Sequence, residues 1–327
     1  MAKGIDWDRQ IGRRIKLRDL HVFLTVAQRG SMAKAAAELG VAQPVVSTVI
    51  AGLEHTIGVR LFDRSTRGVE PTLYGRKLLE GGAVAFDELK QTVKQIEFLA
   101  DPSTGTLRIG CPETVAALLP PIFERMSRRH PHVVFQIAEM ATPTLDVPQL
   151  RDRTLDLAVL RTRWPVPQQS PVDDLDVEKL FEDETVVVVG MESRWARSRN
   201  IDLADLVNEE WILPPPDTTN SMVVMEAFRA RGLRPPTTRF VTYSVTLRTS
   251  LLATGRYVTV LPRSMMSLYA RRMALKVLPI KLAERAWPVV VARLKNRTLN
   301  PAAQIFIEHL RAGVKTLDAK SPDRQRD

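Results

Sequence analysis

Cysteine and histidine are scarce in this sequence, and their scarcity excludes several kinds of protein. The only cysteine is Cys111, so no internal disulfide can form, and a reducing compartment is the natural expectation. An apolar segment precedes Cys111, which favours a buried thiol over a nucleophile. The 5 histidines are scattered, and the sequence has no metal-spaced Cys and His set, no HExxH motif and no glycine-rich phosphate loop. We therefore expect no metal, no cofactor and no enzyme activity.

Long apolar runs are also missing. No stretch approaches the roughly 18 consecutive apolar residues that a membrane span needs. The opening segment, MAKGIDWDRQIGRRI, has no apolar run of signal-peptide length. From these absences we predict a cytoplasmic protein that makes no membrane contact.

Positive charge is in excess, and it is concentrated at one end of the chain. The 327 residues carry a formal net charge of +10, and the 44% apolar content is enough to form cores in two or three domains. Residues 1–77 hold 13 of the 47 Lys and Arg and 7 of the 37 Asp and Glu, a net charge of +6, which leaves +4 for the rest. This distribution favours a basic DNA-binding surface near the N-terminus.

Residues 31–60, SMAKAAAELGVAQPVVSTVIAGLEHTIGVR, are typical of two short helices joined by a tight turn. Ser31 caps the first helix, whose alanines allow close packing, and Gly40 supplies the turn. Pro44 lies in the first turn of the second helix, where a missing amide hydrogen costs little. Apolar residues recur at helical spacing on one face, which we predict to be core: Val46, Val49, Ile50 and Leu53.

The opposite face of the second helix begins with Gln43, Pro44, Ser47 and Thr48. Their short side chains can reach base edges in a major groove. The segment VRLFDRSTRGVEPTL that follows is typical of a two-stranded wing, with Arg64 and Arg67 as its candidate phosphate or minor-groove contacts. An ordinary helical hairpin in a core is the alternative interpretation.

Residues 17–75 resemble the winged helix-turn-helix of LysR-type transcriptional regulators. The resemblance implies operator contacts from Gln43, Pro44 and Ser47, and from Arg64 in the wing. Many members have arginine at the position of Thr48, so the operator sequence of relatives does not transfer to this chain. The candidate DNA contacts are Ser31, Gln43, Pro44, Ser47, Thr48, Arg64 and Arg67.

A heptad pattern runs along residues 75–100 and predicts one long helix. Its apolar positions, spaced alternately by three and four residues, are Leu79, Gly82, Phe86, Leu89, Val93 and Ile96. With the resemblance included, we interpret Leu79, Phe86, Leu89, Val93 and Ile96 as a dimerisation seam. Packing of the helix against its own domain is the alternative. The family implies a homodimer that assembles into a homotetramer.

The rest of the chain alternates β-rich and helical segments, which predicts parallel sheets with crossover helices. Here the resemblance implies two α/β subdomains of the type II periplasmic-binding-protein fold, with LRIG, LDLAVLR and VTVLP as landmarks. The predicted fold class is thus α/β overall, with an all-α winged helix-turn-helix domain at the N-terminus. The predicted parts are a leader at 1–16, the DNA-binding domain at 17–74, the linker helix at 75–100, a hinge at 101–105, an effector domain at 106–312 (subdomain I at 106–185 and 268–312, subdomain II at 186–267) and a disordered tail at 313–327.

Ligands of open α/β sheets bind outside the carboxyl ends of the strands. The loops at those ends carry hydroxyls at Thr114 and Thr142, which match the family's effector site, and a polar loop at 217–220 faces them. Helix capping is the alternative role for these hydroxyls. The predicted effector contacts are Glu113, Thr114, Thr142, Asp217, Thr218, Asn220 and Tyr243. We expect a small polar metabolite, a sugar or an organic acid, and the Glu113 carboxylate favours a neutral polyol.

The sequence thus predicts a ligand-responsive bacterial transcription regulator. Its partners would be a double-stranded DNA operator, a small-molecule effector, copies of itself and, if it activates transcription, RNA polymerase. One alternative is a constitutive DNA-binding protein whose C-terminal domain only oligomerises. A solute-binding protein or an enzyme is the alternative from another class, and both fit residues 31–60 poorly.

Overall fold

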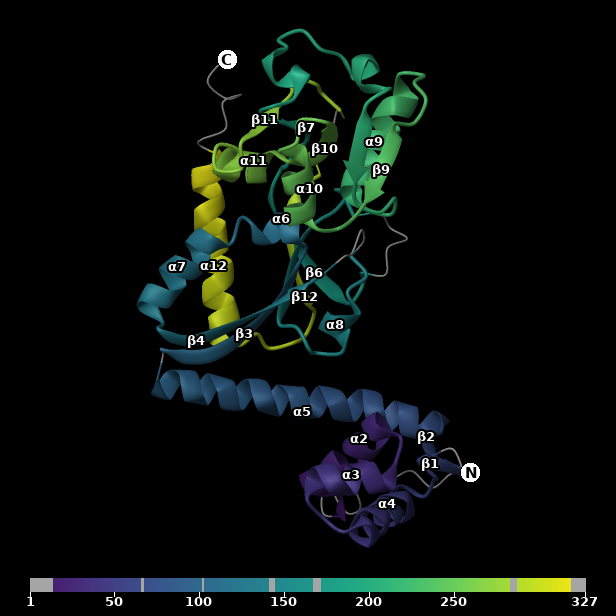
Figure 1. Cartoon of the computed structure of the whole chain (residues 1–327). Coiled ribbons are helices and arrows are strands. Elements are labelled where there is room, and N and C mark those ends of the chain that lie inside the picture. Colours follow the sequence, from purple (N-terminus) through teal and green to yellow (C-terminus); the bar gives the residue numbers. More distant parts are fainter. Residues whose placement is uncertain are drawn as a thin grey trace. The chain divides into compact units, whose positions relative to one another are not determined.

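The computed structural model describes residues 14–65, 68–101, 103–140, 145–166, 172–282 and 287–318 (Figure 1). The chain divides into two compact units, Met1–Thr92 and Val93–Asp327, and each is described by itself. Most of the predicted leader lies outside the described residues, as do Arg67, Thr142 and the end of the predicted tail.

Three helices form the core of the first unit: α2 (Leu17–Arg29), α3 (Met32–Leu39) and α4 (Gln43–Ile57). The axes of α3 and α4 differ by 110°, within the range of a helix-turn-helix. Ala35 and Ala36 are buried between the helices, and Val46 and Ile50 of α4 are fully buried against them. The predicted core face of α4 is therefore confirmed.

Local interactions fix the ends of these helices. The Ser31 hydroxyl accepts a hydrogen bond from the Lys34 backbone N–H at 3.4 Å, so Ser31 is the N-cap of α3. Gly40 ends α3 with a φ of +63°, a conformation that favours glycine. The predicted cap and turn are both present.

A two-stranded hairpin follows α4, formed by β1 (Phe62–Ser65) and β2 (Gly68–Pro71). The Glu54 carboxylate of α4 accepts hydrogen bonds from the backbone N–H groups of Leu61 at 2.8 Å and Phe62 at 3.2 Å. On the other strand, the Val69 N–H donates to the Gly30 carbonyl at 2.9 Å. The predicted wing is thus anchored to the ends of both α4 and α2.

The long helix α5 (Leu73–Ala100) has 28 residues and begins two residues earlier than predicted. Gly82 is buried, and a Cβ added there would lie 3.1 Å from Leu20 of α2, so glycine permits the close crossing of the two helices. Leu79 and Phe86 are half-buried against the core of the first unit, and the Phe86 ring lies 5.7 Å from that of His21. For these two residues the structure shows the alternative role, packing within their own domain.

The remaining positions of the predicted seam are exposed. The exposed fractions are 44% for Leu89, 51% for Val93 and 60% for Ile96. Their role in dimerisation stays a prediction.

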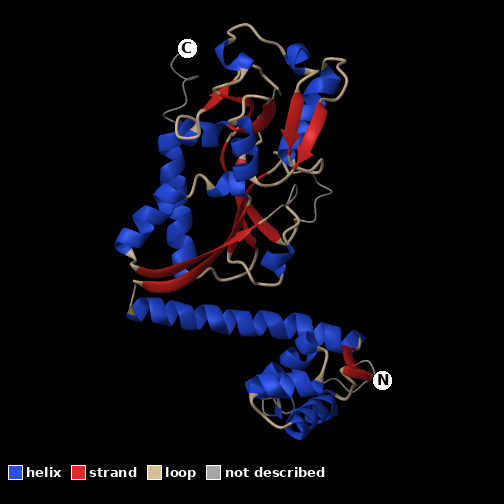
Figure 2. Cartoon of the chain, viewed as in Figure 1, coloured by secondary structure: helices blue, strands red, loops and turns tan. Residues whose placement is uncertain are grey.

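The described strands of the second unit form two five-stranded sheets (Figure 2). The first sheet has the order β4-β3-β5-β12-β6, in which β3 pairs in parallel with β4 and β5, and β12 is antiparallel to both β5 and β6. Its strands are β3 (Thr104–Cys111), β4 (His132–Glu139), β5 (Leu157–Arg161), β6 (Leu175–Phe181) and β12 (Val289–Leu294). Its helices are α6 (Glu113–Ala116), α7 (Pro120–Arg129), α8 (Pro148–Arg151) and α12 (Pro301–Asp318).

The second sheet has the order β11-β7-β10-β8-β9, with β8 parallel to β9 and β10, and β7 antiparallel to β10 and β11. Its strands are β7 (Thr185–Gly190), β8 (Glu210–Leu213), β9 (Thr237–Val241), β10 (Tyr257–Pro262) and β11 (Leu275–Val277). Its helices are α9 (Thr219–Ala230), α10 (Val245–Leu252), α11 (Arg263–Tyr269) and the short 3₁₀ helices η2 (Arg194–Arg197) and η3 (Leu203–Leu206). Both sheets are mixed rather than purely parallel as predicted. The chain crosses from the first sheet to the second before β7 and returns before β12, and each of these two strands is antiparallel to its neighbours.

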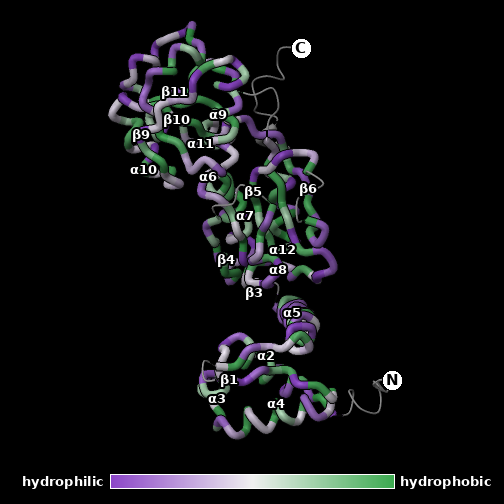
Figure 3. Tube along the Cα trace, turned by 90° about the vertical axis from the view of Figure 1, so that its right-hand side faces the viewer, coloured by the Kyte–Doolittle hydropathy of each residue, from purple (hydrophilic) through white to green (hydrophobic). Residues whose placement is uncertain are grey.

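Apolar side chains fill both sheets. Every residue of β5, β7 and β10 is buried, which is typical of central strands covered on both faces. Figure 3 shows the corresponding concentration of hydrophobic residues in the strands of the second unit. Among the described residues no single helix is long and apolar enough to cross a membrane. Only α3 and α4 taken together, a pair bent by 110°, have the length and apolar content of a membrane span.

Two predicted boundaries were wrong. The second subdomain does not end at 267, because β11 pairs with β7 and Leu278 and Ile280 lie in the same core as Val187; the return connection comes after them. The tail predicted to be disordered from 313 begins with helix, because α12 extends to Asp318.

Candidate functional site

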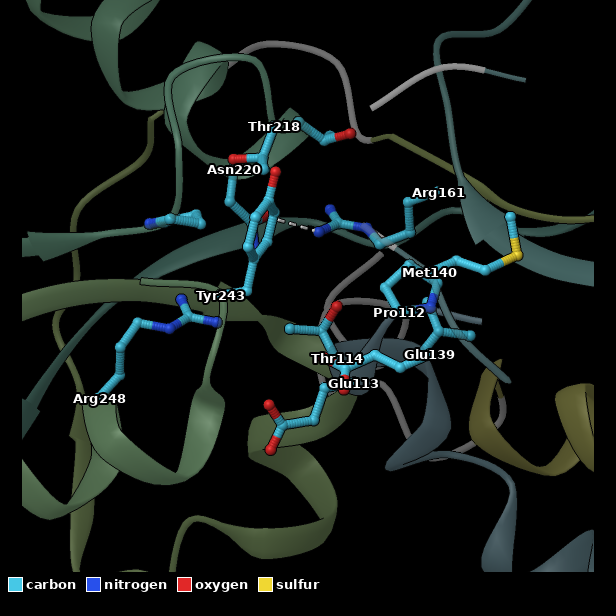
Figure 4. A pocket seen from close by; sticks show the side chains of 13 residues that line it. Pro112, Glu113, Thr114, Glu139, Met140, Arg161, Thr218, Asn220, Tyr243 and Arg248 are labelled. Carbon is cyan, nitrogen blue, oxygen red and sulfur yellow. Dashed lines mark hydrogen bonds between the residues drawn. The ribbon is translucent and has the colours of Figure 1, made fainter. Parts of the chain in front are cut away.

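A pocket of about 70 Å³ lies between the two subdomains of the second unit (Figure 4). Its walls come from the carboxyl ends of β3, β4 and β5 on one side, and of β8 and β9 with the helices α9 and α10 on the other. This is where open α/β sheets place their ligands. The lining residues are Pro112, Glu113, Thr114, Val115, Glu139, Met140, Arg161, Pro214, Thr218, Thr219, Asn220, Tyr243 and Arg248.

Thr114 and Glu113 lie in the first turn of α6, which follows β3 directly. The Thr114 side chain points into the pocket (Figure 4). The Glu113 carboxylate instead crosses to the second subdomain, where it accepts hydrogen bonds from the Val245 backbone N–H at 2.7 Å and the Thr246 hydroxyl at 3.3 Å. It therefore occupies the N-terminus of α10, the positive end of that helix.

Of the predicted contacts in the loop 217–220, two line the pocket. Thr218 is the N-cap of α9: its hydroxyl donates to the Pro215 carbonyl at 2.8 Å and accepts from the Ser221 N–H at 3.4 Å. Thr218 therefore caps a helix as well as lining the pocket. Asp217 is exposed and is not among the residues that line the pocket, so its role as an effector contact stays a prediction.

Arg161, the last residue of β5, is buried with 5% of its surface exposed. Its Nη1 donates to the Asn220 side-chain oxygen at 2.8 Å, and its Nη2 donates to the Asp183 carbonyl at 2.6 Å and the Thr185 hydroxyl at 3.1 Å. Its Nε donates to the Trp287 carbonyl at 3.3 Å and lies 3.7 Å from the Asp183 carboxylate. Burial lowers the pKa of Arg161, and the opposite charge of Asp183 acts against that shift.

Arg248 of α10 is buried even more completely, with 1% of its surface exposed. Its Nη1 donates to the Val260 carbonyl at 3.1 Å, but its Nε has no hydrogen-bond partner within the part of the chain that the structure describes. Burial lowers the pKa of Arg248 to about 10, and the charge of Glu113 acts in the opposite direction. In Figure 4 its guanidinium points into the pocket toward Tyr243 and Glu113.

Neither arginine was predicted as a site residue. Arg161 ends the apolar run LDLAVLR and Arg248 stands in the helix VTLRTSLL, so each is a lone cation among aliphatic residues. A lone cation in an apolar segment was the one signal in the sequence that could have indicated these two residues. A cation is rarely buried unless it is paired, so its position there points to a specific partner.

The predicted DNA contacts lie on the surface of the first unit. Gln43, Pro44 and Thr48 are exposed at the start of α4, and Ser47 is half-buried. The Thr48 hydroxyl donates to the Pro44 carbonyl at 2.9 Å. Arg64 is exposed on β1. Ser31, from the same set of candidates, caps α3 and is half-buried.

Both units match family models. Residues 17–76 match the model described as bacterial regulatory helix-turn-helix protein, lysR family, and residues 100–315 match the LysR substrate binding domain. The chain belongs to the LysR family. It is a DNA-binding transcriptional regulator with an effector-binding domain, and its relatives are regulators rather than enzymes.

Curated relatives span nearly the whole of this LysR-type regulator. The transcriptional dual regulator GltC of Bacillus subtilis is 30% identical over 295 residues, which cover 90% of this chain and 96% of GltC. The regulator GbpR of Azospirillum brasilense is 27% identical over 305 residues, 93% of this chain and 88% of GbpR. The predicted family and fold class are therefore confirmed.

Solved LysR-type regulators share the fold. Full-length CbnR in complex with its target DNA aligns with a TM-score of 0.51 at 23% identity, covering 92% of this chain and all of CbnR. A full-length OxyR variant from Pseudomonas aeruginosa aligns with a TM-score of 0.61 at 22% identity, covering 91% of this chain and 95% of OxyR. At these identities the likeness extends to the fold alone.

The structure thus gathers five of the predicted effector contacts of this LysR-type regulator in one pocket. They are Glu113, Thr114, Thr218, Asn220 and Tyr243. Within the described residues, no group of three or more His, Cys, Asp and Glu is arranged to hold a metal ion.

Proposed function

We propose that this regulator binds its operator as a dimer through α4 and the wing, and that a small polar metabolite in the pocket changes its operator affinity. The observation that carries the proposal is the convergence of polar side chains from both subdomains on one pocket between them. A ligand that contacts both subdomains favours one closure over another, and it shifts DNA binding by its difference in affinity for the two.

The volume of the pocket limits the size of the ligand. Sites for drug-sized ligands usually occupy about 300 to 1,000 Å³, and this pocket is several times smaller. A metabolite of few heavy atoms fits such a space, whether a small sugar or an organic acid.

The DNA side of the proposal rests on the exposed start of α4. Gln43 and Ser47 lie one helical turn apart, so both can face the same groove, while Arg64 extends the surface to the wing. Three exposed apolar residues on the second half of α5, Leu89, Val93 and Ile96, support a dimer interface there.

Operator binding tests the assignment of α4. We expect Gln43→Ala to cost about 1 to 3 kcal/mol at operator DNA while leaving binding to unrelated DNA unchanged. Arg64→Ala should weaken binding to both kinds of DNA. It should also reduce by about 1 the slope of the logarithm of the binding constant against the logarithm of the salt concentration. Fluorescence anisotropy with DNA from upstream of the gene, at several salt concentrations, separates the two effects. If Gln43→Ala binds operator as tightly as the parent, α4 is not the recognition helix.

Effector response tests the pocket. We expect a metabolite panel to contain a compound that changes operator affinity about 5- to 150-fold, and Thr114→Val to lose that response while keeping its affinity for DNA without ligand. A serine at the same position, Thr114→Ser, keeps the hydroxyl and is the matched control. A response that survives in the valine variant would remove Thr114 from the site, and a regulator that no metabolite affects would be the constitutive alternative.

A further inference from the structure

The two buried arginines of the pocket differ in how completely they are satisfied. Each nitrogen of the Arg161 guanidinium has a hydrogen-bond partner within the protein. Arg248 is as deeply buried, yet its Nε has none among the described residues. A buried, incompletely paired cation is costly, so a site that retains one favours an incoming anion.

The opposite wall of the pocket supplies a carboxylate to the same helix. Glu113 accepts hydrogen bonds from the N–H of Val245 and the hydroxyl of Thr246, in the first turn of α10. Arg248 lies one turn further along α10, and its charge interacts with that of Glu113. The start of this helix therefore already binds one carboxylate, which the chain itself provides from the other subdomain.

We propose that the effector is a small organic anion, and that Glu113 substitutes for its carboxylate in the free protein. The incoming anion takes the place of Glu113 at the N-terminus of α10, pairs with Arg248 and releases the contact between α6 and α10. This inference rests on the proposed function, since it names the ligand class of the same pocket. It reverses the expectation that Glu113 favours a neutral polyol, because the Glu113 carboxylate is engaged in a contact that a ligand can replace.

The exchange leaves the charge at the start of α10 unchanged, because one carboxylate replaces another. No covalent bond forms: one carboxylate leaves the helix terminus for solvent and another enters. Glu113 is half-buried, so it can regain water as it leaves, whereas the Nε of Arg248 gains a partner that it lacks among the described residues. The small volume of the pocket suits an acid of few carbon atoms.

Calorimetric titration of the full-length protein with malonate tests the proposal, with the neutral analogue malonamide as the control ligand. Glu113→Gln keeps an acceptor for the Val245 N–H but removes the competing charge. We expect this variant to bind malonate about tenfold or more tightly than the parent, the scale of one charge-assisted hydrogen bond. Malonamide should bind neither protein measurably.

A matched variant separates displacement from a general charge effect. Glu139→Gln removes one negative charge from the same pocket, but Glu139 does not contact α10 among the described hydrogen bonds, so its affinity for malonate should rise by less than about threefold. Adding Arg248→Lys to Glu113→Gln should reverse the gain, because lysine keeps the charge but not the fork of donors. Circular dichroism spectra of each variant confirm that the fold is kept.

The outcomes are distinct. Equal gains for Glu113→Gln and Glu139→Gln, binding of malonamide as tight as that of malonate, or a double variant that keeps the gain would each overturn the proposal. If a neutral sugar changes operator affinity through Thr114, the anion proposal fails and the proposed function stands. If no metabolite changes operator affinity, the proposed function fails, whatever malonate does.

Discussion

At the scale of single residues, burial decides chemistry more than residue type does. Cys111 ends β3 with 1% of its surface exposed, and burial raises the pKa of its thiol from 9.0 to about 11. A thiol with a raised pKa and no access to solvent is a poor nucleophile near neutral pH. The expected buried thiol is thus what the structure contains.

The raised pKa of Cys111 makes stability depend on pH. The folded state holds the thiol proton more tightly than the unfolded state, so this contribution is complete below about pH 9 and is lost as pH rises through about 11. Urea denaturation at pH 8, 9 and 10 measures it. Cys111→Ser, whose hydroxyl does not ionise, should lose less stability than the parent over this interval. Parallel losses in the two proteins would contradict the raised pKa.

Sequence patterns found the hydroxyls of the pocket but not its arginines. Thr114 follows a predicted strand, and the position after a strand is informative because parallel strands share one ligand-binding edge. Arg161 and Arg248 sit inside elements, where a single charge is usually surface exposed. Their role depends on tertiary partners such as Asp183 and Glu113, which no local pattern specifies.

At the scale of elements, α5 combines two kinds of surface in one helix. Its first half packs against the first unit through Gly82 and Phe86, and the apolar residues of its second half are exposed. A heptad pattern predicts which side of a helix is apolar, but it does not say whether the partner is the same chain or another. This is why the predicted seam covers both kinds of contact.

The two halves of α5 should therefore respond differently to the same substitution. Val93→Glu places a charge on the exposed half and should give monomers with an unchanged melting temperature. Phe86→Glu buries a charge against the first unit, and should lower that unit's melting temperature instead. Sedimentation velocity and calorimetry of both variants check this. An unchanged oligomer in Val93→Glu would exclude the exposed half of α5 as the dimer interface.

Glycines in α5 provide a second contrast. A Cβ added at Gly75 would lie 2.0 Å from the Leu61 carbonyl oxygen, so Gly75→Ala should destabilise the first unit by about 1 to 3 kcal/mol. Gly81 is exposed, and an added Cβ meets no atom within 4 Å, so Gly81→Ala should stabilise the helix by up to about 1 kcal/mol. Scanning calorimetry measures whether each variant loses or gains stability. A loss of stability in both variants would contradict the open space at Gly81, and a gain in both would contradict the close packing at Gly75.

Two elements of the second unit, β6 and α11, have weak sequence patterns. The strand β6, LDVEKLF, is half-exposed and rich in charge, and α11 follows β10 without a glycine or a loop to separate them. The central strands β5, β7 and β10 are by contrast fully buried apolar runs. Apolar patterns identify the centre of a sheet better than its edges, because an edge strand has a solvated face.

At the scale of the second unit, Arg161 links both connections between the subdomains. It binds Asp183 and Thr185 on the outgoing connection, Trp287 on the return, and Asn220 in the pocket wall. Through Arg161, the pocket residue Asn220 is therefore coupled to both connections.

Removing this arginine should destabilise the whole second unit. Arg161→Met leaves the Asp183 carboxylate buried without its cation, although Ser264 still donates to it, and should cost about 3 to 5 kcal/mol. Arg128→Met, which breaks an exposed pair with Glu124 on α7, is the control and should cost less than about 1 kcal/mol. Urea denaturation compares the two. Similar costs would mean that Arg161 does not hold the connections together.

The contact between Glu113 and the start of α10 has a consequence for the metabolite concentrations that the cell must reach. A carboxylate tethered beside its binding site competes at a fixed effective concentration, which is on the order of millimolar even for flexible tethers. A free acid that binds the same donors has to approach that concentration before it displaces Glu113. Under the proposal above, the regulator responds to an abundant metabolite and ignores traces of it, and the position of one side chain sets the threshold.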